Sequence, residues 1–354
     1  MEKQDILSLS FDKLAQQMSD LGLPAFRAKQ IFSWLHQKRV RAFSEMTDLP
    51  AALRDDLTER YFISDVSIEK KLVSKLDGTV KYLFALGDGE HVEGVRMEYK
   101  RGGALCISTQ AGCRMGCTFC ASTLAGFSRN LTAGEMLSEV YLAQKDAEGS
   151  DEKVASIVLM GIGEPLDNFD NVMDFLSLVS DARGFDMGMR RISLSTCGLV
   201  DRIYDLAERK LQLTLSISLH APNDEIRRMT MPVAKRYSID ELMRACRDYF
   251  ETTGRRISFE YALIDGVNDR PEHAEELARL LKGMGAHVNL IPVNQVKESG
   301  YRRGKRESVV AFQAVLTENG INATVRRELG ADINAACGQL RRSALETGKI
   351  DSAT

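Results

Sequence analysis

The stretch CRMGCTFC, from Cys113 to Cys120, holds three cysteines in the spacing C-x3-C-x2-C. A structural zinc site uses four ligands and a disulfide framework uses an even number of cysteines, so a group of three fits neither. Three thiolates can hold three irons of a cubane cluster and leave the fourth iron open, whereas electron-transfer [4Fe–4S] clusters use four cysteines. The spacing of Cys113, Cys117 and Cys120 therefore indicates a cluster that does chemistry. The alternative is zinc with a distant fourth ligand, although the chain has no second C-x2-C or H-x3-5-H pair to complete such a site.

Four further cysteines lie apart from this group. Cys246 falls within the amphipathic segment SIDELMRACRDYF, where a thiol that packs as a small apolar side chain is expected. Packing is also favoured for Cys197. Composition alone gives the same interpretation for Cys106, shortly before Cys113, and for Cys337 in DINAACGQL.

The composition is that of an ordinary globular protein. The 354 residues are 44% hydrophobic and 27% charged, with a formal net charge of -3, and they allow one large core with an accessory domain. No apolar run approaches the roughly 20 residues of a membrane span, and the N-terminus MEKQDILSLS lacks the order of a signal peptide. We therefore expect a cytoplasmic protein with no membrane contact, whose clustered thiols serve metal binding or catalysis.

Two segments concentrate positive charge on this mildly acidic chain. Residues 22–42 carry five basic residues and no acidic one, together with the only tryptophan, Trp34. The second segment, KESGYRRGKR (residues 297–306), is also strongly basic. Either can be a solvated surface, but together they favour a polyanionic partner.

The order of expected elements predicts an α/β protein. Short helices fill residues 1–60, which we take as a small helical accessory domain that binds RNA or another polyanion. A hairpin with Asp-Gly at its turn falls in a β extension over residues 61–103. From residue 104 to about 345, β-branched runs alternate with amphipathic helices, two of which start with capping boxes (Thr132 with Glu135, Ser238 with Glu241). Six strands are expected, at residues 104–109, 155–160, 191–196, 213–219, 256–263 and 287–293. This alternation predicts a parallel sheet curved into a partial (β/α)6 barrel.

Polar and glycine-rich residues gather where these strands end. GIGEP follows the second strand, Ser195 ends the third, Ser218 and His220 end the fourth, and Asn294 follows the sixth. The strand C-terminal ends form the active-site mouth in barrels of this kind. The cysteine loop follows the first strand, so it is expected on the same rim.

Four of these segments together carry a resemblance to a known family. They are C-x3-C-x2-C after the first strand, GIGEP after the second, SLHAPNDEIR after the fourth, and ACGQL near the C-terminus. The combination resembles the dual-specificity radical S-adenosylmethionine (SAM) RNA methyltransferases of the RlmN type, and their close relative Cfr. The resemblance extends over nearly the whole chain, from LGLPAFRAKQIFSWL to ACGQL.

The resemblance implies a radical SAM barrel with two cofactors, a [4Fe–4S] cluster and SAM. Cys113, Cys117 and Cys120 match the cluster ligands, and the fourth iron takes the amino and carboxylate groups of SAM. Gly163 and Glu164 match the segment that holds the amino end. The positions that match contacts to the rest of SAM are Ser195, Ser218, Leu219, His220 and Asn294. One departure is Gln295, where many relatives have proline.

The resemblance also implies the reaction, methylation of C2 of an adenine in 23S rRNA and of an adenine in the tRNA anticodon loop. Cys337 matches the cysteine that one SAM methylates; a second SAM activates that methyl group, which adds to C2 and tethers the RNA to the enzyme. Cys106 matches the thiol that resolves the adduct by forming a disulfide with Cys337. Glu93 matches the acceptor of the C2 proton, although by sequence alone it is an ordinary exposed carboxylate.

Three alternatives remain at this point. A Cfr-type enzyme would use the same cysteines to methylate C8 of the same rRNA adenine, which confers antibiotic resistance. A zinc-stabilised RNA-binding protein would have no activity, and a radical SAM enzyme acting on a small molecule or peptide would not need Cys106 and Cys337. For the RlmN type we expect a monomer, with rRNA and tRNA as substrates and a flavodoxin or ferredoxin as reductant.

Overall fold

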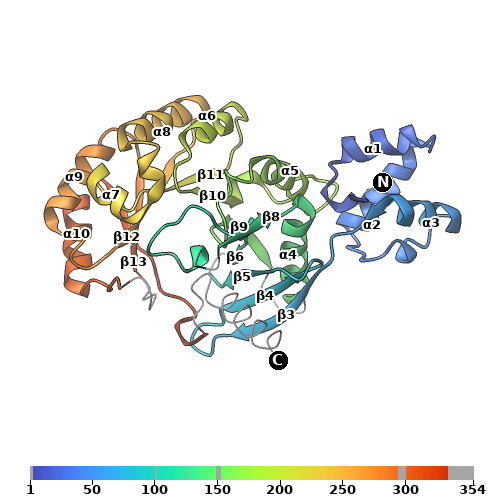
Figure 1. Cartoon of the computed structure of the whole chain (residues 1–354), viewed down its shortest axis with the longest axis horizontal. Coiled ribbons are helices and arrows are strands. Elements are labelled where there is room, and N and C mark those ends of the chain that lie inside the picture. The colour runs from blue at the N-terminus through green and yellow to red at the C-terminus, as the bar shows by residue number, and fades with distance from the viewer. Residues whose placement is uncertain (1–2, 100–101, 125, 149–152, 294–299, 334–354) are drawn as a thin grey trace.

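The computed structural model describes residues 3–99, 102–124, 126–148, 153–293 and 300–333. Its N-terminal part is helical, as predicted, and lies to one side of the sheet (Figure 1). The helices bury apolar side chains such as Leu14, Phe32 and Leu57 in a core that is continuous with that of the barrel. The elements are β1 (Gln4–Asp5), α1 (Phe11–Asp20), α2 (Ala25–His36), α3 (Ala51–Arg60) and β2 (Tyr61–Phe62), with β1 and β2 paired in parallel.

One ten-stranded sheet organises the rest of the protein, in the order β14-β13-β12-β11-β10-β9-β6-β5-β4-β3. From β6 through β9, β10, β11, β12 and β13 to β14, adjacent strands are parallel to one another. They are β6 (Gly103–Cys106), β9 (Val154–Leu159), β10 (Ile192–Thr196), β11 (Thr214–Ser218), β12 (Ile257–Leu263), β13 (His287–Pro292) and β14 (Asn322–Val325). The predicted partial barrel is confirmed, and all six predicted strands are present.

The β extension continues the same sheet in antiparallel order. The predicted hairpin is formed by β3 (Val66–Val73) and β4 (Val80–Leu86), and β5 (His91–Met97) pairs with β4 on one side and β6 on the other. Strand β6 is therefore the boundary between the antiparallel and the parallel halves. Residues that lie directly opposite one another in β3, β4, β5 and β6 have their side chains on the same face of the sheet.

Side-chain alternation gives the parallel strands two different faces. Leu194, Leu215 and Phe259 are fully buried against the helices, whereas Ser195, Ser218 and Glu260 line a cavity on the opposite face. Figure 1 shows the helices in an arc around the outer side of the strands. They are α4 (Ala133–Asp146), α5 (Phe169–Val179), α6 (Val200–Glu208), α8 (Ile239–Thr253), α9 (Pro271–Leu281) and α10 (Arg306–Glu318). Helix α7 (Asp224–Thr230) lies inside this arc (Figure 1). Both predicted capping boxes are present, at α4 and α8.

Three features were not predicted from the sequence. Strand β14 adds a seventh parallel strand; its four residues include only one buried side chain, Ala323, so its apolar signal is weak. A small antiparallel pair, β7 (Gln110–Gly112) with β8 (Phe127–Asn130), flanks the cysteine loop. Strand β5 was included in the extension without being recognised as a strand.

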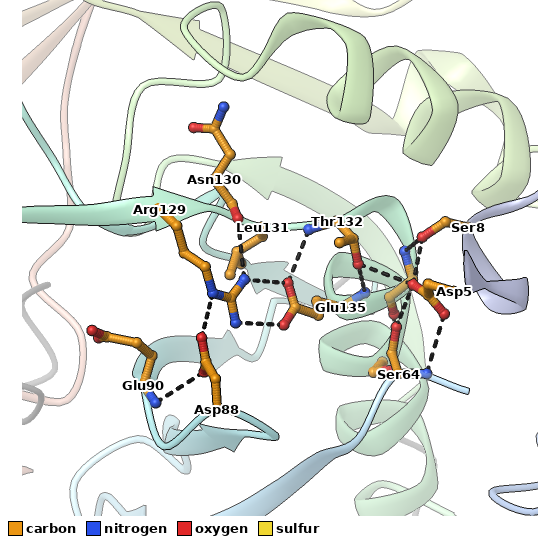
Figure 2. Close-up of polar contacts among 12 residues, drawn as sticks. Asp5, Ser8, Ser64, Asp88, Glu90, Arg129, Asn130, Leu131, Thr132 and Glu135 are labelled. Carbon is orange, nitrogen blue, oxygen red and sulfur yellow. Dashed lines mark hydrogen bonds and ion pairs between the residues drawn. The ribbon is translucent and has the colours of Figure 1, made fainter. Parts of the chain in front are cut away.

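A polar network joins the N-terminal helices to the barrel (Figure 2). The Asp5 carboxylate accepts hydrogen bonds from Ser8 Oγ and Ser64 Oγ, both at 2.6 Å, and from Thr132 Oγ1 at 3.1 Å. Thr132 is the N-cap of α4, and Ser8 Oγ in turn accepts a bond from Gly134 N at 2.8 Å. One buried carboxylate therefore connects β1, the segment after β2 and the start of α4.

Candidate active site

The cysteine loop is closed by the β7–β8 pair. Gly112 lies at its start with φ of +85°, and a Cβ there would be 1.8 Å from the Gly126 carbonyl oxygen, so only glycine fits. Cys113 N donates to Gly126 O at 3.2 Å, and Cys120 N donates to Cys117 O at 3.1 Å. These bonds fold the segment into a compact loop that holds all three cysteines.

Helix α7 supports the loop from the barrel side. Thr118 N donates to the carbonyl oxygen of Thr230, the last residue of α7, at 2.9 Å. Arg227, one turn earlier, is fully buried; its Nη2 donates to Cys197 O at 2.6 Å and its Nε to Leu219 O at 3.3 Å. Its burial lowers the pKa of the Arg227 guanidinium, and the Cys197 and Cys117 thiols, when charged, oppose that shift. Arg227 thus ties together the loops that follow β10 and β11 and adds a buried cation near the cysteine loop.

The loop forms one wall of a cavity of about 210 Å³ at the C-terminal ends of the parallel strands. All three cysteines of the motif line it, as do most residues that the resemblance assigns to SAM. The full lining is Cys113, Met115, Cys117, Phe119, Cys120, Thr123, Leu159, Met160, Gly161, Gly163, Glu164, Pro165, Ser195, Thr196, Cys197, Ser218, His220, Met231, Glu260, Ile291 and Arg326. The strand ends and the cysteine loop therefore converge, as predicted.

The GIGEP turn is fixed by its glycine and its glutamate. Gly163 has φ of +112°, and a Cβ there would lie 2.7 Å from Gln110 Cβ and 2.8 Å from Gln110 N. The Glu164 carboxylate accepts hydrogen bonds from Cys197 N at 2.7 Å and Leu166 N at 3.1 Å. Burial raises the pKa of Glu164, and these N–H groups partly offset that effect. The turn thereby holds a carboxylate at the cavity wall.

His220 is held in one neutral form. It is buried with φ of +55°, and its Nδ1 accepts a hydrogen bond from Ala262 N at 2.9 Å, which leaves the proton on Nε2. Burial, with a contribution from Arg227, lowers the pKa of His220 to about 3. Its ring packs edge-on against Phe119 of the cysteine loop, with centroids 4.8 Å apart. His220 therefore faces the cavity as an uncharged donor at neutral pH.

The donor set of the loop suits an iron–sulfur cluster. Burial raises the pKa of Cys113 to about 12 and also raises the pKa of Cys117, and a charged Cys120 raises both further. Thiolates are stable here only with positive charge supplied by bound metal, which deprotonates a coordinating thiol outright. Within the described residues, no three His, Cys, Asp or Glu side chains converge on a single-ion site. All three thiols line the same cavity, and a group of three suits a cluster with one open iron better than a structural zinc ion, which uses four ligands.

Cys106 and Glu93 lie on the inner face of the sheet beside this cavity. The strand register pairs Cys106 with Val158 of β9 and with Val95 of β5. Met160 lines the cavity and also packs against the buried group that contains Cys106. Glu93, two residues before Val95 on β5, is 1% exposed, so the sequence-based interpretation of an exposed carboxylate is wrong.

The buried carboxylate of Glu93 is paired with Lys81 of β4. Their Nζ and Oε2 atoms are 3.0 Å apart and both side chains are 1% exposed. Strand alternation predicts a polar, solvated face for a segment such as HVEGVRM, but both faces of β5 are covered here. Only the tertiary structure identifies the pair.

Some predicted residues do not line the cavity or fall outside the described chain. Leu219 is fully buried beneath it, with its N–H donating to Glu260 O at 3.1 Å. Cys337 and Asn294 lie outside the described residues. Of the basic residues in the 22–42 segment, Arg39 pairs with Glu148 at 3.5 Å and Arg41 with Asp65 at 3.0 Å. That segment therefore offers a polyanion less charge than its sequence indicates.

Sequence reasoning missed two charged residues of the cavity. Glu260 of β12 accepts a hydrogen bond from Asn289 Nδ2 at 2.8 Å, and burial raises the pKa of its carboxyl group. Arg326, which follows β14, lines the same cavity. The signal for Glu260 was present as an acidic residue at an inward position of an apolar strand. No local signal identifies Arg326, because its strand was not predicted.

Comparisons with known proteins define the class first. Residues 107–281 match the Radical SAM superfamily, and residues 4–63 match the family described as ribosomal RNA large subunit methyltransferase N-terminal domain. The crystal structure of a radical SAM methyltransferase from Sphaerobacter thermophilus superposes with a TM-score of 0.90 at 43% identity, covering 95% of this chain and 98% of that chain. The protein is thus a radical SAM methyltransferase, with a [4Fe–4S] cluster and SAM as its cofactors.

Sequence relatives define the family. The probable dual-specificity RNA methyltransferase RlmN of Alkaliphilus oremlandii is 56% identical over 346 residues, which are 98% of this chain and 100% of the relative. The protein of that name from Clostridium perfringens strain 13 is 52% identical over 344 residues, 97% of this chain and 98% of the relative. The chain belongs to the RlmN family of dual-specificity RNA methyltransferases, and RNA is its substrate. In the described part of the chain no helix is long and apolar enough to cross a membrane.

Proposed function

We propose that this enzyme methylates C2 of an adenine in 23S rRNA and C2 of an adenine in the tRNA anticodon loop, through a covalent RNA adduct on Cys337. The observation that carries the proposal is the position of Cys106 and Glu93 on the inner face of the sheet, next to the cysteine-lined cavity. A radical SAM enzyme that acts on a small molecule needs neither group there. In the proposed mechanism Cys106 releases the product and Glu93 accepts the C2 proton.

The cavity residues hold the cofactors. Cys113, Cys117 and Cys120 bind the cluster, while Glu164 and the Gly163 turn receive the amino end of SAM. The remaining contacts to SAM come from Ser195, Ser218 and His220, which line the cavity, whereas Leu219 is buried beneath it and Asn294 lies outside the described residues. When bound, the cluster supplies the electron that cleaves SAM, which is the source of the transferred carbon. The apolar wall formed by Met115, Phe119 and Met231 keeps water away from this reaction.

The described residues that precede Cys337 in sequence contact the group around Cys106. Leu329 packs against the buried group around Cys106. Gly330 N donates to Asp77 Oδ2 at 2.9 Å, and the Asp332 carboxylate accepts from Ser74 Oγ at 2.6 Å and Lys75 N at 2.9 Å. The chain is thereby anchored beside the β3–β4 turn a few residues before Cys337.

Release of the product is a thiol–disulfide step. The Cys106 thiolate attacks Sγ of Cys337, an S–S bond forms, and the C–S bond to RNA breaks with its electron pair passing to the methylene carbon. That carbon takes a proton and becomes the methyl group. The radical adduct gives up one electron, which the bound cluster would take back, and Glu93 accepts the C2 proton, whose bonding electrons restore the aromatic adenine ring. A cellular dithiol returns the disulfide to two thiols for the next turnover.

RNA approaches the open side of the cavity with its target adenine out of the stack. Lys29 and Lys38 are exposed in the first basic segment, and Lys38 Nζ lies 3.1 Å from the centroid of the Trp34 ring. Arg302 of the second segment is exposed as well, whereas Arg303 is paired with Glu328 at 2.7 Å. We assign phosphate contacts to Lys29, Lys38 and Arg302. We further propose a monomer in the cytoplasm, reduced by a flavodoxin or ferredoxin.

The test is mass spectrometry of RNA from a strain that lacks the enzyme and is complemented with it. 2-Methyladenosine in both rRNA and tRNA is expected. 8-Methyladenosine in its place would assign the Cfr-type reaction. Cys106→Ala is expected to accumulate RNA bound to Cys337 while keeping its iron; Cys246→Ala, which removes a buried thiol of α8, is the matched control. Full activity of Cys106→Ala without adduct would contradict the mechanism.

A further inference from the structure

Glu260 is a buried carboxylate on the wall of the cofactor cavity, and the proposed mechanism gives it no role. It is 4% exposed and lines the cavity from β12. Its Oε2 accepts a hydrogen bond from Asn289 Nδ2 at 2.8 Å, and its Oε1 accepts one from Ser258 Oγ at 3.3 Å. Neither oxygen forms an ion pair with a residue that the structure describes. A glutamate is almost never fully buried unless it is paired, so a bound ligand is expected to complete its contacts.

The sheet fixes the position of this carboxylate. The carbonyl oxygen of Glu260 accepts a bond from His220 N at 3.2 Å, which ties β12 to the loop that follows β11. In the strand register Glu260 lies opposite Ser218 on one side and Asn289 on the other, so the three side chains share one face. Ser195 Oγ lies 3.4 Å from Ser218 Oγ and extends this polar row to β10. Glu260 is therefore the charged member of a polar row on the cavity side of β10–β13.

The carboxylate has capacity for further hydrogen bonds. An ionised carboxylate offers about four acceptor sites, of which Asn289 and Ser258 use two. Burial raises the pKa of Glu260, whereas the bond from Asn289 and the charge of Arg326 lower it and favour the ionised form. The remaining sites are available to hydroxyl or N–H donors of a molecule in the cavity.

The chemistry of SAM decides which of its groups suits Glu260. The amino-acid end is assigned to the cluster and to Glu164, which follows β9 and is separated from β12 by β10 and β11. At about 4.8 Å per strand, that is roughly 14 Å along the sheet. The adenine edge alternates a donor with an acceptor, so only one of its groups attracts a carboxylate. The ribose offers two adjacent hydroxyl donors, which match the acceptors of an acidic side chain, as in dinucleotide-binding sites.

We propose that Glu260 binds the ribose hydroxyls of SAM and makes the cavity selective for a ribonucleoside. The inference rests on the proposed placement of SAM in this cavity and is independent of which carbon of the RNA adenine is methylated. Glu260 thereby orients the nucleoside half of the cofactor, while the cysteine loop and the GIGEP turn hold the amino-acid half.

The experiment measures binding by anaerobic calorimetry to the full-length holoenzyme with its cluster unreduced. The ligands are S-adenosylhomocysteine, which carries no transferable methyl group, and its 2′-deoxy and 3′-deoxy forms. The variants are Glu260→Gln and Glu260→Asp, and iron content is measured for each. Glu276→Gln is the matched control, because Glu276 of α9 also accepts a bond from an asparagine, Asn223, at 2.9 Å but does not line the cavity.

For the wild type we expect each deoxy form to bind at least about tenfold more weakly, because each lost hydroxyl removes a hydrogen bond to a charged group. Glu260→Gln should bind S-adenosylhomocysteine at least about tenfold more weakly and distinguish the three ligands by less than about threefold. Glu276→Gln should behave as the wild type. A purely structural role of Glu260 would weaken all three ligands by the same factor and leave the preference for hydroxyls intact.

Two outcomes separate this inference from the placement of SAM on which it rests. If Gly163→Ala weakens binding of S-adenosylhomocysteine but Glu260→Gln keeps the wild-type preference for hydroxyls, the inference about Glu260 is wrong. If neither substitution changes the affinity for any ligand, SAM does not occupy this cavity. Equal affinity of the wild type for all three ligands would also overturn the inference.

Glu260→Asp decides if Glu260→Gln loses its iron. The shorter side chain keeps the charge but withdraws both oxygens by one methylene group. Discrimination below about threefold is then expected, since a hydrogen bond lengthened by a methylene is lost. Wild-type discrimination in Glu260→Asp would contradict the inference.

Discussion

The carboxylate of Asp5 is expected to control how firmly the N-terminal helices are held against the barrel. It accepts five hydrogen bonds, from Leu7 N, Ser64 N, Ser8 Oγ, Ser64 Oγ and Thr132 Oγ1; Figure 2 shows Asp5 among Ser8, Ser64 and Thr132. Asp5 is 7% exposed, so water replaces few of these bonds. The substitution Asp5→Ala removes every acceptor at once.

The size of the effect follows from the donors left behind. A buried donor without an acceptor costs about 1–3 kcal/mol, and hydroxyl groups can turn to other acceptors more easily than backbone N–H groups can. Counting mainly Leu7 N and Ser64 N, we expect a loss of about 3 kcal/mol in the free energy of opening this junction. That corresponds to a roughly 100-fold larger population of the opened state. The apolar core shared by the helices and the barrel keeps the global fold.

Hydrogen exchange measured by mass spectrometry tests this expectation. Exchange of amides in α1 and α2 should accelerate by about 100-fold in Asp5→Ala, while amides in α9, at the far side of the barrel, stay unchanged. RNA affinity should fall, because the exposed lysines of α2 and the following turn lose their fixed position, while iron content remains constant. Asp55→Ala, an exposed site on α3, is the control. Equal exchange in Asp5→Ala and wild type would refute the structural argument.

Two further predictions concern acid stability and the GIGEP turn. Burial lowers the pKa of His36 to about 3, so the folded protein cannot take the proton that the unfolded chain binds below about pH 6.5. The free energy of unfolding of the protein is therefore highest above that pH and is lower by about 2 kcal/mol at pH 5. In urea unfolding, His36→Phe should lose this dependence on pH, whereas His273→Asn should keep it. Gly163→Ala places a Cβ 2.7 Å from Gln110 Cβ at positive φ. It should weaken SAM binding at least about tenfold by calorimetry, while Gly188→Ala, with no atom within 4 Å, should bind normally.

The barrel could be predicted from the sequence because its signals are local. Each of the six predicted strands alternates with an amphipathic helix, and the capping residues Thr132 and Ser238 mark helix starts within a few positions. The cysteine motif, the GIGEP turn and the His220 segment follow different strands, and a parallel sheet brings such ends to one rim. Their convergence on a single cavity could therefore be predicted from the order of the strands alone.

The charge pairs could not be predicted because their partners are distant or hidden in an ordinary pattern. Lys81 and Glu93 each occupy a position where alternation favours a solvated side chain, and only the cover over the inner face buries them. The sequence around Arg39 and Arg41 indicates a basic surface. In the structure Arg39 is paired with Glu148, far along the chain, and Arg41 with Asp65, beyond the next helix. Sequence patterns report burial on one face of an element; they do not report what covers the other face.

The position of β6 explains how one sheet can serve two kinds of chemistry. On one side β6 is parallel to β9, whose end leads into the GIGEP turn and the cofactor cavity. On the other side it is antiparallel to β5, which carries Glu93 and is paired in turn with the strand of Lys81. Cys106 lies on this boundary strand, opposite Val158 and Val95 at once. In the proposed mechanism Cys106 meets the RNA adduct on one side and the proposed proton acceptor Glu93 on the other, and a shift of β6 by one residue would turn Cys106 away from both.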